Sequence, residues 1–208
     1  MFDSYPSDID WFCFINGCPI HIASNGGPLP HGLYTPTTLT EAFNAVQASE
    51  SSFDWDINRE FIRSQIEAYG YTREFDIHNR ETLLLPKFIN RDKYDDMTIE
   101  QIAYSWSFIE MAKKGFFSFD RVNENLYRLV AYPTKYAHSF IDSTTKEFII
   151  PPFPQSYCHA CSIIKGYFET ETKILSTTRH LFTDKPITFG LNTDIDLIDL
   201  INSIIAPE

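Results

Sequence analysis

Apolar residues along this chain recur at two different spacings, which predict a mixture of helices and strands. Thr98 and Gln101 have the spacing of a capping box, and a mostly apolar run follows them and ends before Gly115. That run predicts a central helix that is largely buried, because few of its faces are suited to water. Directly afterwards, the apolar segments 116–122 and 126–132 flank a short polar break, and this pattern predicts a β-hairpin.

Another hairpin, called the first hairpin because it comes first in the chain, is predicted near the N-terminus. The Asn-Gly pair at 16–17 is a strong turn signal, because both turn positions need positive φ, and it lies between the apolar segments 11–15 and 18–23. One face of this hairpin is wholly apolar and is expected to meet the core. The other face carries two phenylalanines, Pro19 and His21. Pro19 has no amide donor, so we expect it at a sheet edge or a bulge.

The remaining segments complete the prediction of an α+β fold. Helices are expected near 38–48, 57–69 and 193–205, and the second of these has Asp56 as N-cap and Gly70 as stop. Short strands are expected near 82–85, 147–150 and 187–189, and a strand or a helix is expected near 167–175. Because helices and hairpins do not alternate regularly, we expect a mainly antiparallel sheet built from hairpins and packed on about four helices. Residues 1–208 are interpreted as a single domain, with a weak candidate boundary at the proline cluster 151–154.

Composition narrows the class of protein. Aromatic residues make up 15% of the chain, which favours a core filled by rings. A formal net charge of −11 argues against nucleic acid as a partner, because phosphate binding depends on Lys and Arg. The first residues do not resemble a secretory signal, and no segment is long and apolar enough to span a bilayer. We therefore expect a cytoplasmic protein that does not associate with membranes.

No nucleotide-binding, nucleophile-elbow or zinc-protease motif occurs in the sequence. Candidate chemistry gathers instead at the end of the first hairpin, where His21 precedes a glycine-rich turn. His21 and Ser24 are the catalytic candidates, since a histidine can act as general base while turn amides bind an anion. The candidate ligand-binding residues are Asn25, Gly26, Gly27, Asp120 and Arg121. A structural role for His21, stacked against Phe12, is the alternative interpretation.

The four cysteines offer a possible metal site. Cys158 and Cys161 have the two-residue spacing of zinc ligands, and Cys13 with Cys18 could complete a four-thiolate site. Cys13 and Cys18 also lie on the apolar face of the first hairpin, which favours ordinary buried thiols. We therefore expect no cofactor, with structural zinc as the alternative.

Two functions remain open at this stage. The acidic charge and the lack of a coherent catalytic motif favour a binding protein whose partner is a protein, and a protein with a basic surface is a candidate. The alternative is an enzyme that acts on a small anionic or nucleotide-like substrate, with a pocket at the end of the first hairpin. That pocket requires His21 and Arg121 to converge in space. Acidic clusters, such as the one at 194–199, are alternatively explained as carboxylates favoured at helix N-termini.

Overall fold

The computed structural model describes residues 3–4, 10–29, 41, 44–51, 53–69, 96–134, 147–150, 180–181 and 186–205 of the 208-residue chain. The strands are β1 (Asp3–Ser4), β2 (Asp10–Ile15), β3 (Cys18–Ala23), β4 (Pro28–Leu29), β5 (Trp55–Ile57), β6 (Phe117–Asn123), β7 (Leu126–Pro133), β8 (Glu147–Ile150), β9 (His180–Leu181), β10 (Ile187–Gly190) and β11 (Ile195–Asp196). The helices are α2 (Arg59–Tyr69), α6 (Ile99–Lys113) and α9 (Leu197–Ile205). Residues 44–48 are also helical, within the range 38–48 where a helix was predicted. None of the helices in these ranges combines the length and apolar character needed to cross a membrane.

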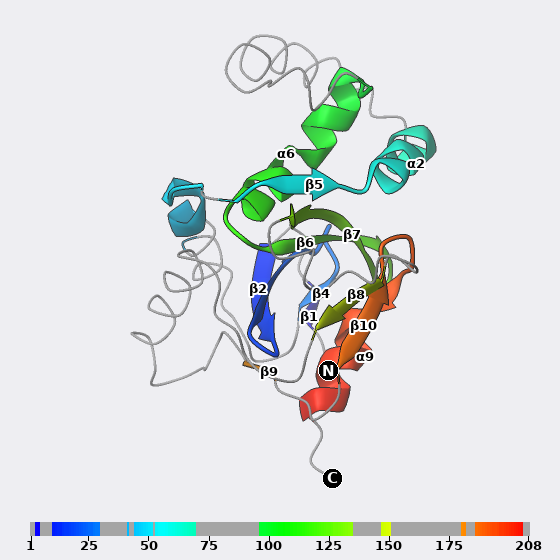
Figure 1. The fold of residues 1–208 in the computed structure, drawn as a ribbon. Helices are drawn as coiled ribbons and strands as arrows, with labels where there is room; N and C mark the ends of the chain where they lie inside the picture. The colour runs from blue at the N-terminus through cyan, green and yellow to red at the C-terminus, as the bar shows by residue number, and fades with distance from the viewer. Residues whose placement is uncertain are drawn as a thin grey trace.

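One mixed sheet organises the fold (Figure 1). Its strands run in the order β11-β7-β6-β3-β2-β9, and β5 also pairs with β7. The β3–β6 and β2–β9 pairs are parallel, and the other pairs in this sheet are antiparallel. Two smaller antiparallel pairs, β1–β4 and β8–β10, complete the described strands. The predicted α+β fold with a mainly antiparallel sheet is therefore confirmed.

The first hairpin forms at the predicted turn. Asn16 and Gly17 have φ values of 48° and 78°, as a two-residue turn of this type requires. Both faces of the hairpin are buried, including the face that carries His21. Pro19 belongs to an interior strand, but the pairing of β3 with β6 begins only at Ile20, so no neighbour needs the missing Pro19 amide.

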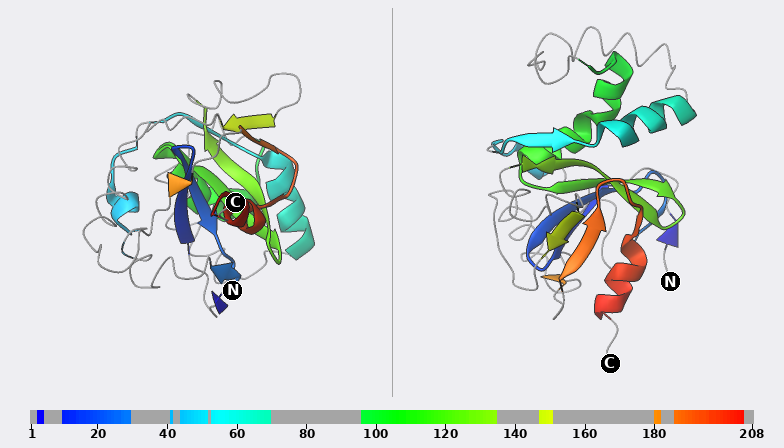
Figure 2. Two further views of the ribbon diagram at one scale, coloured as in Figure 1. Left: turned by 90° about the horizontal axis from the view of Figure 1, so that it is seen from below. Right: turned by 45° about the vertical axis from the view of Figure 1, so that its right-hand side comes forward.

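Two packed layers lie on opposite sides of the β6–β7 hairpin (Figures 1 and 2). On one side, α2 and α6 pack on the sheet through Phe61, Ile62, Phe108, Ile109 and Ala112. On the other side, strands β8 and β10 and helix α9 contribute Phe148, Phe189, Leu197, Ile198 and Ile201 to the larger core. The rings of Phe148 and Phe189 are stacked with centroids 5.3 Å apart, and Phe117 meets Phe148 edge-on. Among the buried residues that the structure describes, aromatic side chains therefore gather mainly in this larger core.

The central helix α6 begins as predicted. Thr98 accepts a hydrogen bond from the Gln101 amide, and the Gln101 side chain accepts one from the Thr98 amide, which completes the capping box. Gly115 follows the helix with φ 99°, a conformation that glycine adopts without strain. The face of α6 that contains Phe108 and Ile109 is buried against the sheet.

Helix α2 differs from the prediction at its start. We expected Asp56 to cap a helix that includes residue 57, but residues 55–57 form β5, which pairs with β7. The N-cap is Asn58, whose side-chain oxygen accepts a hydrogen bond from the Phe61 amide at 3.1 Å. The prediction was wrong because pairing with β7 keeps Ile57 extended although its apolar side chain fits the helical spacing.

The C-terminal helix also starts later than expected. We expected a helix from about residue 193, whereas Ile195 and Asp196 form β11 beside β7, and α9 begins at Leu197. The predicted strands at 147–150 and 187–189 are present as the β8–β10 pair. The predicted elements at 82–85 and 167–175, the helix start at Thr38, the stop at Gly70 and the boundary at 151–154 lie outside the described residues. The single-domain interpretation stays a prediction.

Candidate functional site

The predicted site residues lie where two parallel strands end. Strands β3 and β6 run side by side in register, with His21 opposite Ser118 and Ala23 opposite Asp120. The turn after β3 therefore lies next to Arg121. His21 and Ser118, 97 positions apart in the sequence, are thus brought together. The predicted pocket, however, required His21 to converge with Arg121, which projects from the opposite face of the sheet.

His21 lies in the interior of the protein. Its side chain is 0% exposed, its Nδ1 atom forms a 2.5 Å hydrogen bond with the Ser118 hydroxyl, and its Nε2 atom lies 3.6 Å from Asp10 Oδ1. The ring centroid is 5.4 Å from that of Phe12, as the structural interpretation of His21 expected. These contacts form a polar row on the sheet face that α6 covers, in which His21 and Ser118 are buried and Asp10 is half-buried.

Asp120 belongs to the same side of the sheet. Its carboxylate accepts hydrogen bonds from the Tyr104 hydroxyl on α6 and from the Arg121 amide, and the residue is only 5% exposed. Asp120 faces Arg128 across the β6–β7 hairpin, but the Arg128 guanidinium donates to Asp194 at 2.7 Å. The hydrogen bond to Tyr104 links the end of β6 to α6.

Arg121 makes a different set of contacts. Its Nε donates to the Glu124 carbonyl at 2.6 Å, and its Nη1 donates to the Asn25 carbonyl at 3.4 Å. Its side chain lies directly against Gly27, where an added Cβ would come within 2.6 Å of Arg121 Cδ and Nε. Gly27 is buried, and its amide donates to the Ser24 carbonyl at 2.7 Å. The guanidinium thus connects the turn after β3 with the turn after β6.

The predicted site residues consequently fall into two groups. Arg121 lies opposite Tyr127 across the hairpin, and Tyr127 packs in the larger core, whereas Ser118 and Asp120 face α6. Because successive side chains of a strand point to opposite faces, Arg121 projects away from the face that holds His21. Asn25 and Gly27 join Arg121, while His21 joins Asp120 on the α6 side. Gly26 is exposed at the turn with φ 68°, and the catalytic roles of His21 and Ser24 stay predictions.

The structure adds residues that the sequence did not single out. Asp10, Ser118 and Tyr104 contact the predicted residues His21 and Asp120 directly. The period-two spacing of Ser118 and Asp120 places both on one face of a strand. Their proximity to His21, however, depends on the parallel pairing of β3 with β6, for which the sequence carries no local signal.

Tyr127 is a further buried polar residue near this site. Its hydroxyl has no hydrogen-bond partner among the described residues, and the side chain is 0% exposed. Burial raises the pKa of Tyr127 to about 12, while the positive charge of Arg121 acts in the opposite direction. Tyr127 is therefore sensitive to the charge at Arg121.

The cysteines that the structure describes are ordinary buried thiols. Cys13 and Cys18 are free, and burial raises the pKa of each thiol above its usual range. Within the described ranges, no three His, Cys, Asp or Glu side chains are grouped so that they could hold a metal ion. Cys158 and Cys161 lie outside those ranges, so the zinc interpretation stays a prediction.

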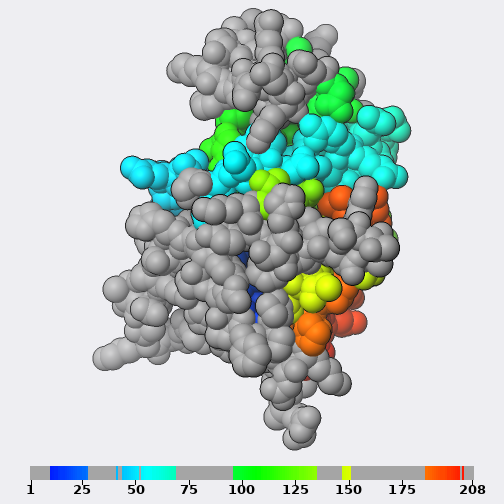
Figure 3. Space-filling view, in the orientation of Figure 1, coloured from blue at the N-terminus to red at the C-terminus, as the bar shows by residue number. Residues whose placement is uncertain are grey.

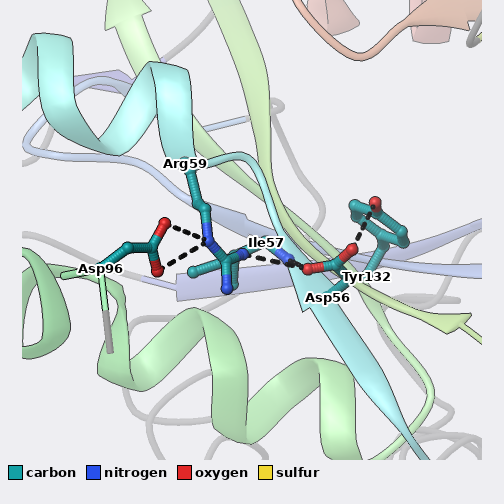
Figure 4. A network of polar contacts seen from close by, with 5 residues as sticks. All are labelled: Asp56, Ile57, Arg59, Asp96 and Tyr132. Carbon is teal, nitrogen blue, oxygen red and sulfur yellow. Dashed lines mark hydrogen bonds and ion pairs between the residues drawn. The ribbon is translucent and has the colours of Figure 1, made fainter. Parts of the chain in front are cut away.

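Acidic residues near the helix starts have local partners. Arg59 Nε lies 3.1 Å from Asp96 Oδ2, and Arg59 Nη1 lies 3.3 Å from Asp56 Oδ1 (Figure 4). The Tyr132 hydroxyl donates to Asp56 Oδ2 at 3.4 Å, and burial together with Asp56 raises the Tyr132 pKa. At the start of α9, the Asp196 side chain accepts a hydrogen bond from the backbone amide of Asp199. These contacts support the interpretation of several acidic residues as helix-end groups.

Comparison with known proteins adds no relative to this description. No protein-family model, no curated protein and no solved structure matches the chain.

Proposed function

We propose that the protein acts by binding a protein partner that presents a basic surface, without a self-contained catalytic centre. The main support is the contrast between charge and apolar surface. The formal net charge is −11, whereas Ile149 on β8 is the large apolar side chain that is exposed among the described residues, at 37%. Recognition through charge is therefore better supported than recognition through an apolar patch, and complementary charge both accelerates association and selects partners.

The burial of His21 supports this choice over the enzyme alternative. A general base must come within hydrogen-bond reach of the proton that it removes from the substrate. His21 is 0% exposed and already engages Ser118, so its contacts suit a structural role. The enzyme alternative keeps one supporting observation, which is the approach of Arg121 to Asn25 and Gly27.

Helix α2 offers acidic side chains to such a partner. Glu60 and Glu67 are both exposed on this helix, whose side chains reach the surface in Figure 3. Glu60 accepts a hydrogen bond from the Asn192 side chain, and no described cation forms an ion pair with either glutamate. Their charges are therefore available to attract a basic surface at long range.

The test is binding of a fluorescent lysine-rich peptide, followed by anisotropy at several salt concentrations. We expect saturable binding that weakens with salt, and no binding of a glutamate-rich peptide of equal length. A double variant, Glu60→Gln with Glu67→Gln, should bind about two- to thirtyfold more weakly, since exposed charge pairs contribute about 0.2–1 kcal/mol each. Ser64→Ala on the same helix is the matched control without a charge change. The proposal is contradicted if the affinity for the lysine-rich peptide does not change with salt concentration, or if binding does not saturate.

A further inference from the structure

Arg121 differs from Arg59 and Arg128 in that it does not pair with a described carboxylate. Arg59 pairs with Asp56 and Asp96, and Arg128 pairs with Asp194. Arg121 forms no ion pair with a carboxylate within the described part of the chain, although the protein is strongly acidic. Its hydrogen bonds go to two backbone carbonyls, so no carboxylate among the described residues neutralises its positive charge by direct contact.

The guanidinium is also held in place. One carbonyl binds Nε and another binds Nη1, so the fork is fixed at two of its three nitrogens. A guanidinium has five N–H donors, and these two bonds leave the Nη2 edge able to donate. The side chain is only partly buried, so solute can approach it. Pre-organised guanidinium groups of this kind bind planar carboxylates and phosphates through paired hydrogen bonds.

Gly27 makes this position possible. The side chain of Arg121 lies so close to Gly27 that a Cβ there would overlap Cδ, Nε and Cζ at 2.6–2.7 Å. The Arg121 side chain therefore packs directly against the Gly27 backbone. Gly27 is not in the left-handed region, so space for Arg121 is the feature that favours glycine at this position.

We propose that Arg121, held over Gly27, forms a binding site for a small oxyanion, either a carboxylate or a phosphate group. The site lies at the carboxyl ends of the parallel strands β3 and β6, on the opposite sheet face from His21. It needs no catalytic residue and is independent of the proposed basic protein partner. The ligand expected at Asn25, Gly27 and Arg121 is thus a small oxyanion.

The experiment titrates the intact protein with inorganic phosphate and, separately, with acetate at constant ionic strength set by chloride. Binding is followed by NMR of tyrosine labelled at Cζ, with the Tyr127 signal assigned from Tyr127→Phe. Tyr127 is a local reporter because it lies opposite Arg121 and feels its charge. We expect a saturable shift of the Tyr127 signal. A response to phosphate alone identifies a phosphate site, and a response to acetate alone identifies a carboxylate site.

Variants locate the binding. Arg121→Gln should weaken anion binding at least about tenfold, which is the scale of a hydrogen bond to a charged group. Arg121→Lys should weaken anion binding less, because it keeps the positive charge but loses the planar guanidinium. Gly27→Ala keeps every charge but displaces the arginine, and should also weaken binding about tenfold. Arg63→Gln, at an exposed arginine of α2, is the matched control and should bind as the parent does.

Three outcomes overturn the proposal. One is the lack of a saturable Tyr127 response to either anion in the parent protein. A second is an equal loss with Arg63→Gln and Arg121→Gln, which would show diffuse attraction. The third is parent-like binding by Gly27→Ala. Unchanged circular dichroism and urea midpoints establish that the Gly27 and Arg121 variants are folded. Failure here leaves the lysine-rich peptide result untouched, because that test depends on acidic residues of α2.

Discussion

Asn58 is the residue whose side chain should contribute most clearly to stability. It is 2% exposed, and its Nδ2 donates to the carbonyls of Leu129 and Leu191 at 3.2 and 2.7 Å. Its Oδ1 accepts from the Phe61 amide, and its own amide donates to the Val130 carbonyl at 2.8 Å. One side chain therefore joins β7, the start of α2 and the residue that follows β10.

A bulge in β7 creates part of this arrangement. The register with β6 shifts between Ser118 and Phe119, whose partners are Ala131 and Leu129, so Val130 has no partner on β6. In a regular strand, successive carbonyls point in opposite directions. At the bulge, the carbonyls of Leu129 and Val130 both accept hydrogen bonds from Asn58.

Removing this side chain should be costly. Asn58→Ala loses an N-cap, worth about 1 kcal/mol, and two further hydrogen bonds worth about 1 kcal/mol each. We expect the free energy of unfolding to fall by about 3 kcal/mol, a large share of the roughly 5–15 kcal/mol typical of a domain. In urea unfolding followed by tryptophan fluorescence, this corresponds to a midpoint lower by about 1 M or more, at an m-value of about 2–3 kcal/mol/M.

Two further variants separate the contributions. Asn58→Asp keeps the oxygen that caps α2 but loses both amide donors, so we expect a loss of about 2 kcal/mol or more. Asn192→Ala removes an exposed asparagine that bonds to Glu60, and should change stability by less than about 0.5 kcal/mol. If Asn58→Ala unfolds within about 0.5 kcal/mol of the parent, the hydrogen bonds assigned to this side chain do not stabilise the fold.

Three other outcomes follow from the described contacts. Thr98→Ala should lower the free energy of unfolding, measured in urea, by about 1 kcal/mol, because it removes the hydroxyl that accepts a hydrogen bond from the Gln101 amide. Thr98→Ser should keep the parent stability, whereas Thr98→Val should not. Tyr127→Phe should leave stability at pH 7 within about 0.5 kcal/mol, because the lost hydroxyl has no described partner. The folded pKa of Tyr127 is raised from 10.0 to about 12, so stability should fall as pH rises between these values, and Tyr127→Phe should reduce that fall; an unchanged alkaline unfolding midpoint argues against the shift. Native Cys13 and Cys18 should react with a thiol reagent far more slowly than in urea, and equal rates would contradict their burial.

Local signals in the sequence predicted those elements whose cause is local. The Asn-Gly turn at 16–17 requires only its own φ values, and the Thr98 capping box requires only residues three positions apart. Both are present as predicted. The start of α2 was mispredicted, since Asp56 and Asn58 are both good N-caps and the choice depends on the pairing of residues 55–57 with β7.

The candidate site shows the same division. Its residue types were visible in the sequence, and Asn25, Gly27 and Arg121 do meet in space. The burial of His21 was not predictable, because it depends on α6 and on pairing with a strand that begins nearly 100 positions later. Period-two alternation then decides that Arg121 and His21 face opposite sides of the sheet.

By itself, the sequence determined the α+β class, the two hairpins, the capped central helix and the acidic charge, because these depend on short-range spacing and composition. Only the tertiary structure decided which polar residues share a neighbourhood. The parallel pairing of β3 with β6 places His21 beside Ser118 and brings the turn at Gly27 to Arg121. Such contacts arise because burial of both sheet faces selects one strand order, and strand order is a property of the whole chain.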